Sequence, residues 1–293
     1  MKMNDAAIIR STEDALARRA AWREWLESPP GRYALDWQQQ QFDAAVADMF
    51  GFHALQCGLP QLDALRDNRM PHRIRACEPC DMPVQGGASV VIDHFEELPF
   101  ASQSIDLAVL PHVLEFAEDP HQVLREIDRV LRPEGRVIVS GFNPISLWGA
   151  RQWLTRGVSH RPFLPREGQF IGLPRLRDWF KLLGFEFDRG RYGCYRPPCR
   201  TQHWLDRTQF MESAGDRWWP ICGALYIVSG IKRVRGMRLI GPAWRQARLA
   251  RAPAAAVSPR CEPNRKTRAR MPLGPDSTPT DASVGVHVGA RQR

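Results

Sequence analysis

The 293-residue sequence lacks any long hydrophobic run. The longest apolar stretch of its C-terminal half, residues 221–231, is well short of the ~20 residues that a membrane-spanning helix needs. The first fourteen residues contain acidic side chains and no apolar h-region, which is not typical of a secretory signal. The sequence therefore predicts no membrane span and a cytoplasmic location.

Paired cysteines are also scarce. The chain has seven cysteines, an odd number, and they are scattered. Cys77 and Cys80 form one C-x-x-C pair, and Cys194 and Cys199 form a looser one. Because a structural zinc site usually has two tight pairs, we predict no metal site. Unpaired thiols in a chain of this size suit a reducing compartment.

Apolar side chains are rare in the C-terminal tail, residues 243–293. This tail has ten Lys or Arg against three Asp or Glu, six prolines and one aromatic residue, and it carries most of the net charge of +9. So little apolar surface does not offset the entropy of ordering, and we predict a disordered basic tail. Such a tail can contact anionic surfaces non-specifically. A solvated extension without a dedicated partner is the favoured interpretation, and no specific nucleic-acid binding is predicted.

Two helical segments precede the first predicted strand. Residues 12–27 are rich in Ala, Leu, Arg and Glu, and Pro29, Pro30 and Gly31 are expected to end this helix. A second helical run follows from Tyr33 to about residue 50. Residues 1–50 are therefore predicted to form an N-terminal helical cap.

Short apolar segments follow at regular intervals, and their β-branched, nearly continuous character is typical of buried parallel strands. The predicted strands are 53–57, 73–77, 89–93, 105–110, 136–140, 185–188 and 224–231. A further helix is predicted at 173–183. Together these elements predict one α/β domain at residues 51–242.

The helix between the fourth and fifth strands has the clearest signals. Asp119 is its predicted N-cap and Pro120 its first residue, and Pro133 is expected to stop it. Its apolar residues recur at helical spacing, which gives a strand–helix–strand unit with a right-handed crossover. The charged residues of its other face are predicted to be solvated, and they are Arg125, Glu126 and Arg129.

The run from Glu96 to Pro144 carries a resemblance to a known family. It contains L-P-F-x-x-x-S-I-D before the fourth strand, and D-P-x-x-x-L-x-E-x-x-R-V-L-x-P-x-G leading into the fifth. Both segments closely resemble the type-11 methyltransferases, a family of class I enzymes that use S-adenosylmethionine (SAM), and the F-N-P-I-S-L-W-G continuation resembles a bacterial branch. The resemblance implies a Rossmann-like fold with a seven-stranded, mostly parallel, doubly wound sheet whose last strand is antiparallel. It also implies SAM across the ends of strands one to four.

The resemblance assigns cofactor-binding positions to the loops that follow the strands. These are Gln56, Gly58, His94, Phe95, Glu96, Leu98, Leu110, Pro111 and His112. The glycine motif is weakened, because Gln56, Gly58 and Pro60 stand where the family has an acid and two or three glycines. Glu78 is the nearest counterpart of the acid that ends strand two, and Asp93 is offset by one position from the acid after strand three. The G-x-G-x-x-G of a dinucleotide oxidoreductase is absent.

Two polar residues are weak candidates for catalysis. His112 is either a general base or a hydrogen-bonded loop histidine. Asn143 either orients a methyl acceptor or makes a turn before Pro144. Asp106, near the start of strand four, is interpreted as structural. Two functions remain open, a methyltransferase with an unidentified acceptor and a non-catalytic binding or regulatory protein that has lost efficient SAM binding.

Overall fold

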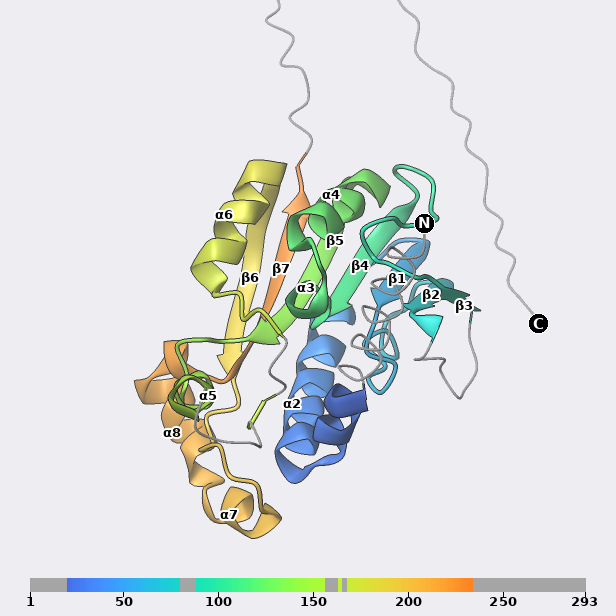
Figure 1. Cartoon of the computed structure of the whole chain (residues 1–293). Coiled ribbons are helices and arrows are strands. Elements are labelled where there is room, and N and C mark those ends of the chain that lie inside the picture. Colours follow the sequence, from blue (N-terminus) through green and yellow to red (C-terminus); the bar gives the residue numbers. More distant parts are fainter. Residues whose placement is uncertain (1–19, 80–87, 156–162, 165–167, 234–293) are drawn as a thin grey trace, which may run out of the picture. The chain divides into compact units, whose positions relative to one another are not determined.

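The computed structural model describes residues 20–79, 88–155, 163–164 and 168–233. The first part of the predicted N-terminal helix, Cys80 and the basic tail lie outside the described residues. Within them a seven-stranded sheet has the order β3-β2-β1-β4-β5-β7-β6 (Figure 1). The strands are β1 His53–Cys57, β2 His72–Cys77, β3 Ala88–Val91, β4 Ile105–Pro111, β5 Leu131–Phe142, β6 Phe185–Gly193 and β7 Leu225–Lys232.

The strand pairing confirms the predicted topology. β1 pairs in parallel with β2 and β4, β2 with β3, and β4 with β5. β7 runs antiparallel between β5 and β6. Since the order reverses between β1 and β4, loops on either side of this point diverge and leave room for a ligand.

Helices cover both faces of the sheet (Figure 1). The labelled helices are α2 Pro29–Val46, α3 Val113–Phe116, α4 Pro120–Val130, α5 Leu147–Thr155, α6 Leu173–Leu183, α7 Gln202–Arg207 and α8 Phe210–Trp218, of which α5, α7 and α8 lie beyond the end of the strands, and the 3-10 helix η2 Pro220–Cys222 follows α8. Ala108 and Leu110 of β4 point into the core shared with α4 and α6, whereas Leu107 and Val109 point into the core shared with α2. This alternation is what a doubly wound sheet requires. None of the helices among the described residues is long and apolar enough to cross a membrane.

The N-terminal helices meet at Ser28. Residues 20–27 are helical, and α2 begins at Pro29, four residues earlier than the sequence predicts. The hydroxyl of Ser28 accepts the N–H of Gly31 as the N-cap. Proline is favoured in the first helical turn because its φ is already helical and its missing N–H has no partner to lose. The two prolines therefore end one helix and start the next, and α2 stops at Val46 rather than near residue 50.

α4 begins where the sequence predicts, but the charged residues of its outer face do not have the predicted role. Asp119 accepts the N–H groups of His121 and Gln122, and Pro120 is the first residue. The prediction that Glu126 and Arg129 form a solvated face is wrong. Their ion pair holds the segment before β4, because Glu126 accepts the N–H of Leu98 and Arg129 donates to the carbonyls of residues 98 and 100.

Asp106 has the predicted structural role. It accepts the N–H groups of Phe52 and His53 at the start of β1 and pairs with Arg132. Burial alone would raise the pKa of Asp106, but these donors hold it below its ordinary value of 3.8. The ionised carboxylate thus fastens the amino end of β1 to β4.

Asp106→Asn is expected to be less stable than the native chain at neutral pH, with a smaller difference in acid. A lowered carboxyl pKa gives stability above the unfolded value, and this stability is lost as the pH falls through the folded value. Urea unfolding at about pH 7 and about pH 3 measures both differences. A stability difference that is the same at both pH values would contradict this role.

Candidate active site

The carboxyl ends of β1, β2, β4 and β5 meet at one edge of the sheet (Figure 1). The residues that follow these ends are Gly58, Glu78, His112 and Asn143. In open α/β sheets, this edge beside the switch in strand order is the usual ligand site. The structure thus brings together the loops in which the sequence places cofactor and acceptor.

Gln56 organises the loop after β1. Its side chain is buried and donates to the carbonyls of Leu59 and Leu62 at 3.2 and 2.7 Å, while its oxygen accepts the N–H of Ala64 at 3.0 Å. An amide can donate to carbonyls and a carboxylate cannot, which explains why Gln replaces the family's acid here. Its hydrogen bonds lie within the loop, and a direct contact with cofactor stays a prediction.

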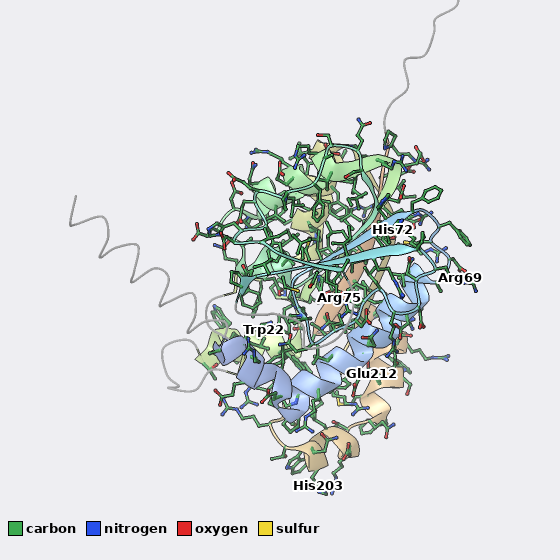
Figure 2. The ribbon with its side chains drawn as sticks, turned by 90° about the vertical axis from the view of Figure 1, so that its right-hand side faces the viewer. Trp22, Arg69, His72, Arg75, His203 and Glu212 are labelled. Atoms are coloured by element: carbon green, nitrogen blue, oxygen red, sulfur yellow. The ribbon has the colours of Figure 1, made fainter. Side chains whose placement is uncertain are left out.

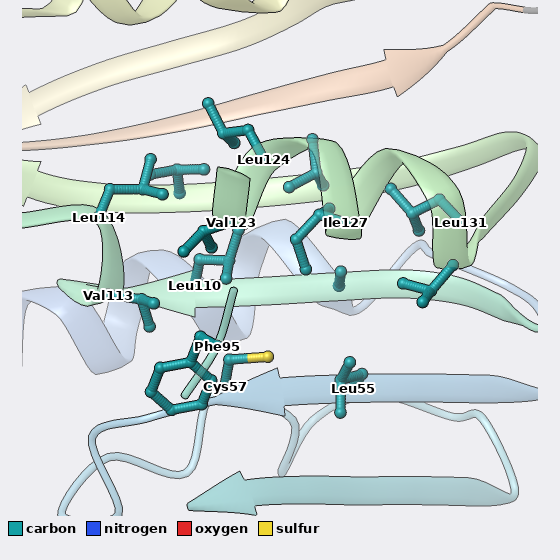
Figure 3. Close-up of a cluster of buried hydrophobic side chains, with 14 of the residues drawn as sticks. Leu55, Cys57, Phe95, Leu110, Val113, Leu114, Val123, Leu124, Ile127 and Leu131 are labelled. Carbon is teal, nitrogen blue, oxygen red and sulfur yellow. The ribbon is translucent and has the colours of Figure 1, made fainter. Parts of the chain in front are cut away.

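Gly58 has a left-handed backbone, with φ of +69°, which favours glycine. Its N–H donates to the carbonyl of Ala76 at 2.8 Å. A Cβ at this position would lie 3.1 Å from Val113 and 3.7 Å from the ring of Phe95. Figure 3 shows Phe95 and Val113 beside Cys57 at the end of β1. The side chains of Val113 and Phe95 thus fill the space that a side chain at position 58 would occupy.

The other predicted cofactor residues divide into two groups. Phe95, Leu98, Leu110 and Pro111 are buried, whereas His94 is exposed. The carboxylate of Glu96 accepts the N–H groups of residues 118 and 119, and so it joins the loop after β3 to the start of α4. Whether these residues contact the cofactor stays a prediction.

The acids after β2 and β3 differ in their placement. Glu78 follows β2 directly and is half-buried, and it is the acid nearest to the end of strand two, where the family has its ribose-binding acid. β3 ends at Val91, two residues before its predicted end, so Asp93 lies in the following loop and is exposed. Of the two, Glu78 is the better placed acid for the cofactor.

His112 and Glu115 form a buried pair after β4. The Nδ1 atom of His112 lies 2.6 Å from a carboxylate oxygen of Glu115, and each side chain is only 2% exposed. The other oxygen of Glu115 accepts the N–H of Phe142. A carboxylate at Nδ1 favours the tautomer with the proton there, which leaves Nε2 as a proton acceptor. This contact fixes the orientation of the imidazole ring and leaves Nε2 without a hydrogen-bond partner.

The carboxylate of Glu115 also acts on Tyr226 of β7. Burial, followed by the negative charge of Glu115, raises the pKa of Tyr226 well above its ordinary value. The Tyr226 hydroxyl therefore keeps its proton. In the same region, burial raises the pKa of the Cys57 thiol, so this cysteine is a packing residue rather than a nucleophile.

Aromatic rings surround His112. Phe142 and Trp22 lie 4.7 and 5.2 Å from its ring, measured between centroids. Trp22 stacks on Trp25 at 5.2 Å, and Figure 2 shows Trp22 on the short helix ahead of α2. The rings exclude water from the buried pair, which strengthens its electrostatic interactions.

Asn143 makes the predicted turn. Its amide nitrogen donates to the carbonyls of Ile221 and Gly223, and its oxygen accepts the N–H of Ile145. These bonds join the end of β5 to η2 and leave the amide engaged within the protein. A role for Asn143 in orienting an acceptor stays untested.

Sequence reasoning missed several residues around His112. They are Trp22, Trp25, Gln38, Glu115 and Ser140. The spacing of His112 and Glu115 by three residues after a strand was the available signal, since such residues share one side of a helical turn. None of the described cysteines, residues 57, 77, 194, 199 and 222, forms a disulfide, and no group of metal-binding side chains occurs among the described residues.

Residues 68–139 match the family model of the type-11 methyltransferases, described as a methyltransferase domain. This segment includes the loops after β2, β3 and β4, and the strand order agrees with it. The resemblance to this family is confirmed. The methyltransferase-like domain also has the fold of the class I SAM-dependent enzymes.

Individual relatives agree with this assignment. The uncharacterised protein YafS of Escherichia coli K12 is 34% identical over 163 residues, which are 55% of this chain and 64% of YafS. The C-methyltransferase UbiE of Syntrophotalea carbinolica, of ubiquinone and menaquinone biosynthesis, is 26% identical over 51% of this chain and 62% of its own length. The chain thus spans under two thirds of the length of either relative.

Solved structures agree on the fold. A SAM-dependent methyltransferase from Thermotoga maritima is similar with a TM-score of 0.51 and 17% identity, over 72% of this chain and 95% of its own. A methyltransferase from Haloferax volcanii, solved with its Trm112 activator, has a TM-score of 0.51 and 16% identity. The alignment covers 74% of this chain and 98% of that one. At such identities the similarity concerns the fold alone.

Proposed function

We propose that the protein is a SAM-dependent methyltransferase that uses His112 as its general base. The observation that carries the proposal is the buried pair of His112 and Glu115, with a 2.6 Å contact at Nδ1, at the edge of the sheet where the family holds its cofactor. A base in this position has a use in methyl transfer, because the acceptor must lose a proton.

Two features of this edge support SAM binding. Glu78 stands directly after β2, where a carboxylate accepts hydrogen bonds from ribose hydroxyls, and Gly58 keeps the left-handed turn of the first loop. The loop from His94 to Leu98 would face the adenine, and Pro111 and His112 would face the methyl group. When bound, SAM supplies a methyl group already activated by its sulfonium.

The residues around the acceptor have separate tasks. His112 takes the acceptor's proton at Nε2, and the carboxylate of Glu115 stabilises the positive charge that the ring then carries. Trp22 and Phe142 exclude water and restrict the acceptor to an orientation in line with the methyl group. Packing against neighbouring residues fixes the positions of these four side chains.

Calorimetry with S-adenosylhomocysteine tests the cofactor site. The native chain is expected to bind it, and Glu78→Gln to bind it about tenfold more weakly, since hydrogen bonds to a charged group are worth about 1.5–3 kcal/mol. Asp178→Asn, a change to an exposed acid on α6, is the control and should bind like the native chain. Equal affinities of the two variants would contradict the placement of ribose at Glu78.

A second candidate function is a non-catalytic protein with the same fold. The N–H of Gly58 is already bonded to Ala76, and Phe95 and Val113 occupy the space beside Gly58. Both features favour a first loop that serves packing. The same calorimetry separates the two candidates, because absence of binding at millimolar cofactor would leave only the second.

We further propose that the domain spans residues 51–242 and acts in the cytoplasm, without a dedicated partner for the basic tail. The lack of a disulfide among the described cysteines supports a reducing compartment. The relatives do not identify the acceptor, since the acceptor wall at Trp22 lies outside the matched segment 68–139.

A further inference from the structure

Three buried polar atoms near the base have no hydrogen-bond partner. Among the described residues, six buried side-chain nitrogen or oxygen atoms are unpartnered, and Trp25 Nε1, Gln38 Nε2 and His112 Nε2 are three of them. Buried polar groups are nearly always paired, so several unpaired atoms on neighbouring side chains mark a place where a ligand can supply the missing partners.

The three atoms belong to one connected group. The oxygen of Gln38 accepts the hydroxyl of Ser140 at 2.9 Å, and the carbonyl of Ser140 accepts the backbone N–H of His112 at 3.1 Å. The ring of Trp25 lies 5.6 Å from that of Phe142, which itself contacts the ring of His112. The three side chains therefore all lie near the end of β5.

The chemistry of these atoms specifies what a ligand must offer. With its oxygen bonded to Ser140, Gln38 presents an N–H donor, and Trp25 Nε1 can only donate. Each needs a hydrogen-bond acceptor. His112 Nε2, with the proton held on Nδ1 by Glu115, needs a donor. A ligand with a hydroxyl and a further oxygen satisfies all three, whereas an ammonium group offers no acceptor to Gln38 and Trp25.

The walls specify the shape of the ligand. Trp22, Trp25 and Phe142 present ring faces and edges, which pack best against another flat ring. Glu115 is the carboxylate of the group and already bonds to His112 and the backbone of Phe142, so it is not free to pair with a cationic ligand. The site therefore favours an uncharged aromatic compound.

We propose that the methyl acceptor is an aromatic ring with a hydroxyl next to a second oxygen, and that the hydroxyl oxygen is methylated. The proposal rests on the proposed function. In the step, the hydroxyl O–H bond breaks and its proton goes to His112 Nε2. The oxygen forms the new bond to the methyl carbon as the S–CH₃ bond breaks, and the sulfur keeps that electron pair as S-adenosylhomocysteine leaves.

Calorimetry of the full chain with small probe compounds tests the ligand class. Catechol has the flat ring, the hydroxyl and the second oxygen, whereas trans-1,2-cyclohexanediol lacks the flat ring and benzylamine carries a cation instead. Catechol is expected to bind at least about tenfold more tightly than either, since each lost contact leaves buried groups unpaired. Equal or tighter binding of cyclohexanediol or benzylamine would overturn the proposal.

Variants test the donors. Trp25→Phe removes only the indole N–H and its outer ring, and Gln38→Glu keeps an oxygen for Ser140 while replacing the donor. Each is expected to weaken catechol binding about tenfold. Gln40→Glu, on an exposed position of the same helix, is the control. Far-UV circular dichroism verifies folding. If Trp25→Phe folds and binds catechol like the native chain, the assignment of the donor is wrong.

Two further measurements separate this proposal from the proposed function. If S-adenosylhomocysteine binds and catechol does not, the ligand class is wrong and the cofactor site stands. If catechol binds and S-adenosylhomocysteine does not, the ligand class is supported and the methyltransferase function fails. With SAM and catechol together, 2-methoxyphenol is the expected product, and a ring-methylated product would overturn the assignment of the oxygen.

Discussion

His112→Asn is expected to lower methyl transfer to catechol by about 10²- to 10⁴-fold, the usual contribution of a general base. Asparagine suits this test because its amide can still donate toward Glu115, whereas nothing replaces Nε2. It also tolerates the left-handed backbone of residue 112, whose φ is +56°. The variant should therefore fold and keep the cofactor site while it loses the base.

The rate is measured as 2-methoxyphenol formed at saturating SAM, and S-adenosylhomocysteine affinity is measured in parallel. His203→Asn, at an exposed position of α7, is the matched control and should behave like the native chain. A His112→Asn rate within about threefold of native would show that the histidine only packs the loop. Loss of cofactor affinity instead of rate would assign it to binding.

Gln56→Met is expected to lower the free energy of unfolding by about 2–6 kcal/mol. Methionine has a similar size but no hydrogen-bonding amide, so it leaves the carbonyl of Leu62 and the N–H of Ala64 buried and unpaired. Each such group costs about 1–3 kcal/mol. The side chain of Gln56 bonds the carbonyls of Gly58, Leu59 and Leu62 and the N–H of Ala64, which all lie in the first loop.

Urea unfolding measures this loss, and Gln40→Met on the exposed side of α2 is the control. The control should change the stability by at most about 0.5 kcal/mol, as surface substitutions usually do. If Gln56→Met were as stable as the control, the hydrogen bonds of Gln56 would not be holding the loop.

The strands and the sheet could be predicted because their signal is local. β1 has the predicted bounds, 53–57, and β4 differs by a single residue, because continuous apolar segments between polar turns mark buried strands. β7 was predicted from its own apolar residues, at 224–231, but its antiparallel direction was predicted from the family resemblance. A buried strand can thus be predicted from its own residues, without knowledge of the strands that pair with it.

The site could be predicted only in part, because its contacts join distant segments. His112 was singled out by its place after β4. Gln38 meets Ser140 across 102 positions of the chain, and no spacing rule connects them. The pair of Glu126 and Arg129 looked like ordinary helix charges, since their partners at residues 98 and 100 precede the helix by a full strand. Polar contacts between elements that are far apart in the sequence therefore could not be predicted from the sequence pattern.

The placement of the acceptor wall on the helices before β1 has an evolutionary consequence. The cofactor loops and the base lie within residues 56–115, whereas Trp22, Trp25 and Gln38 come from a contiguous stretch that precedes the sheet. On the proposed assignment, recombination that replaces this leading stretch would exchange Trp22, Trp25 and Gln38 around the base without altering Phe142 or the loops that follow the strands. On the same assignment, the cofactor loops and much of the acceptor wall thus belong to separate stretches of the chain, and a new acceptor would need changes in only one of them.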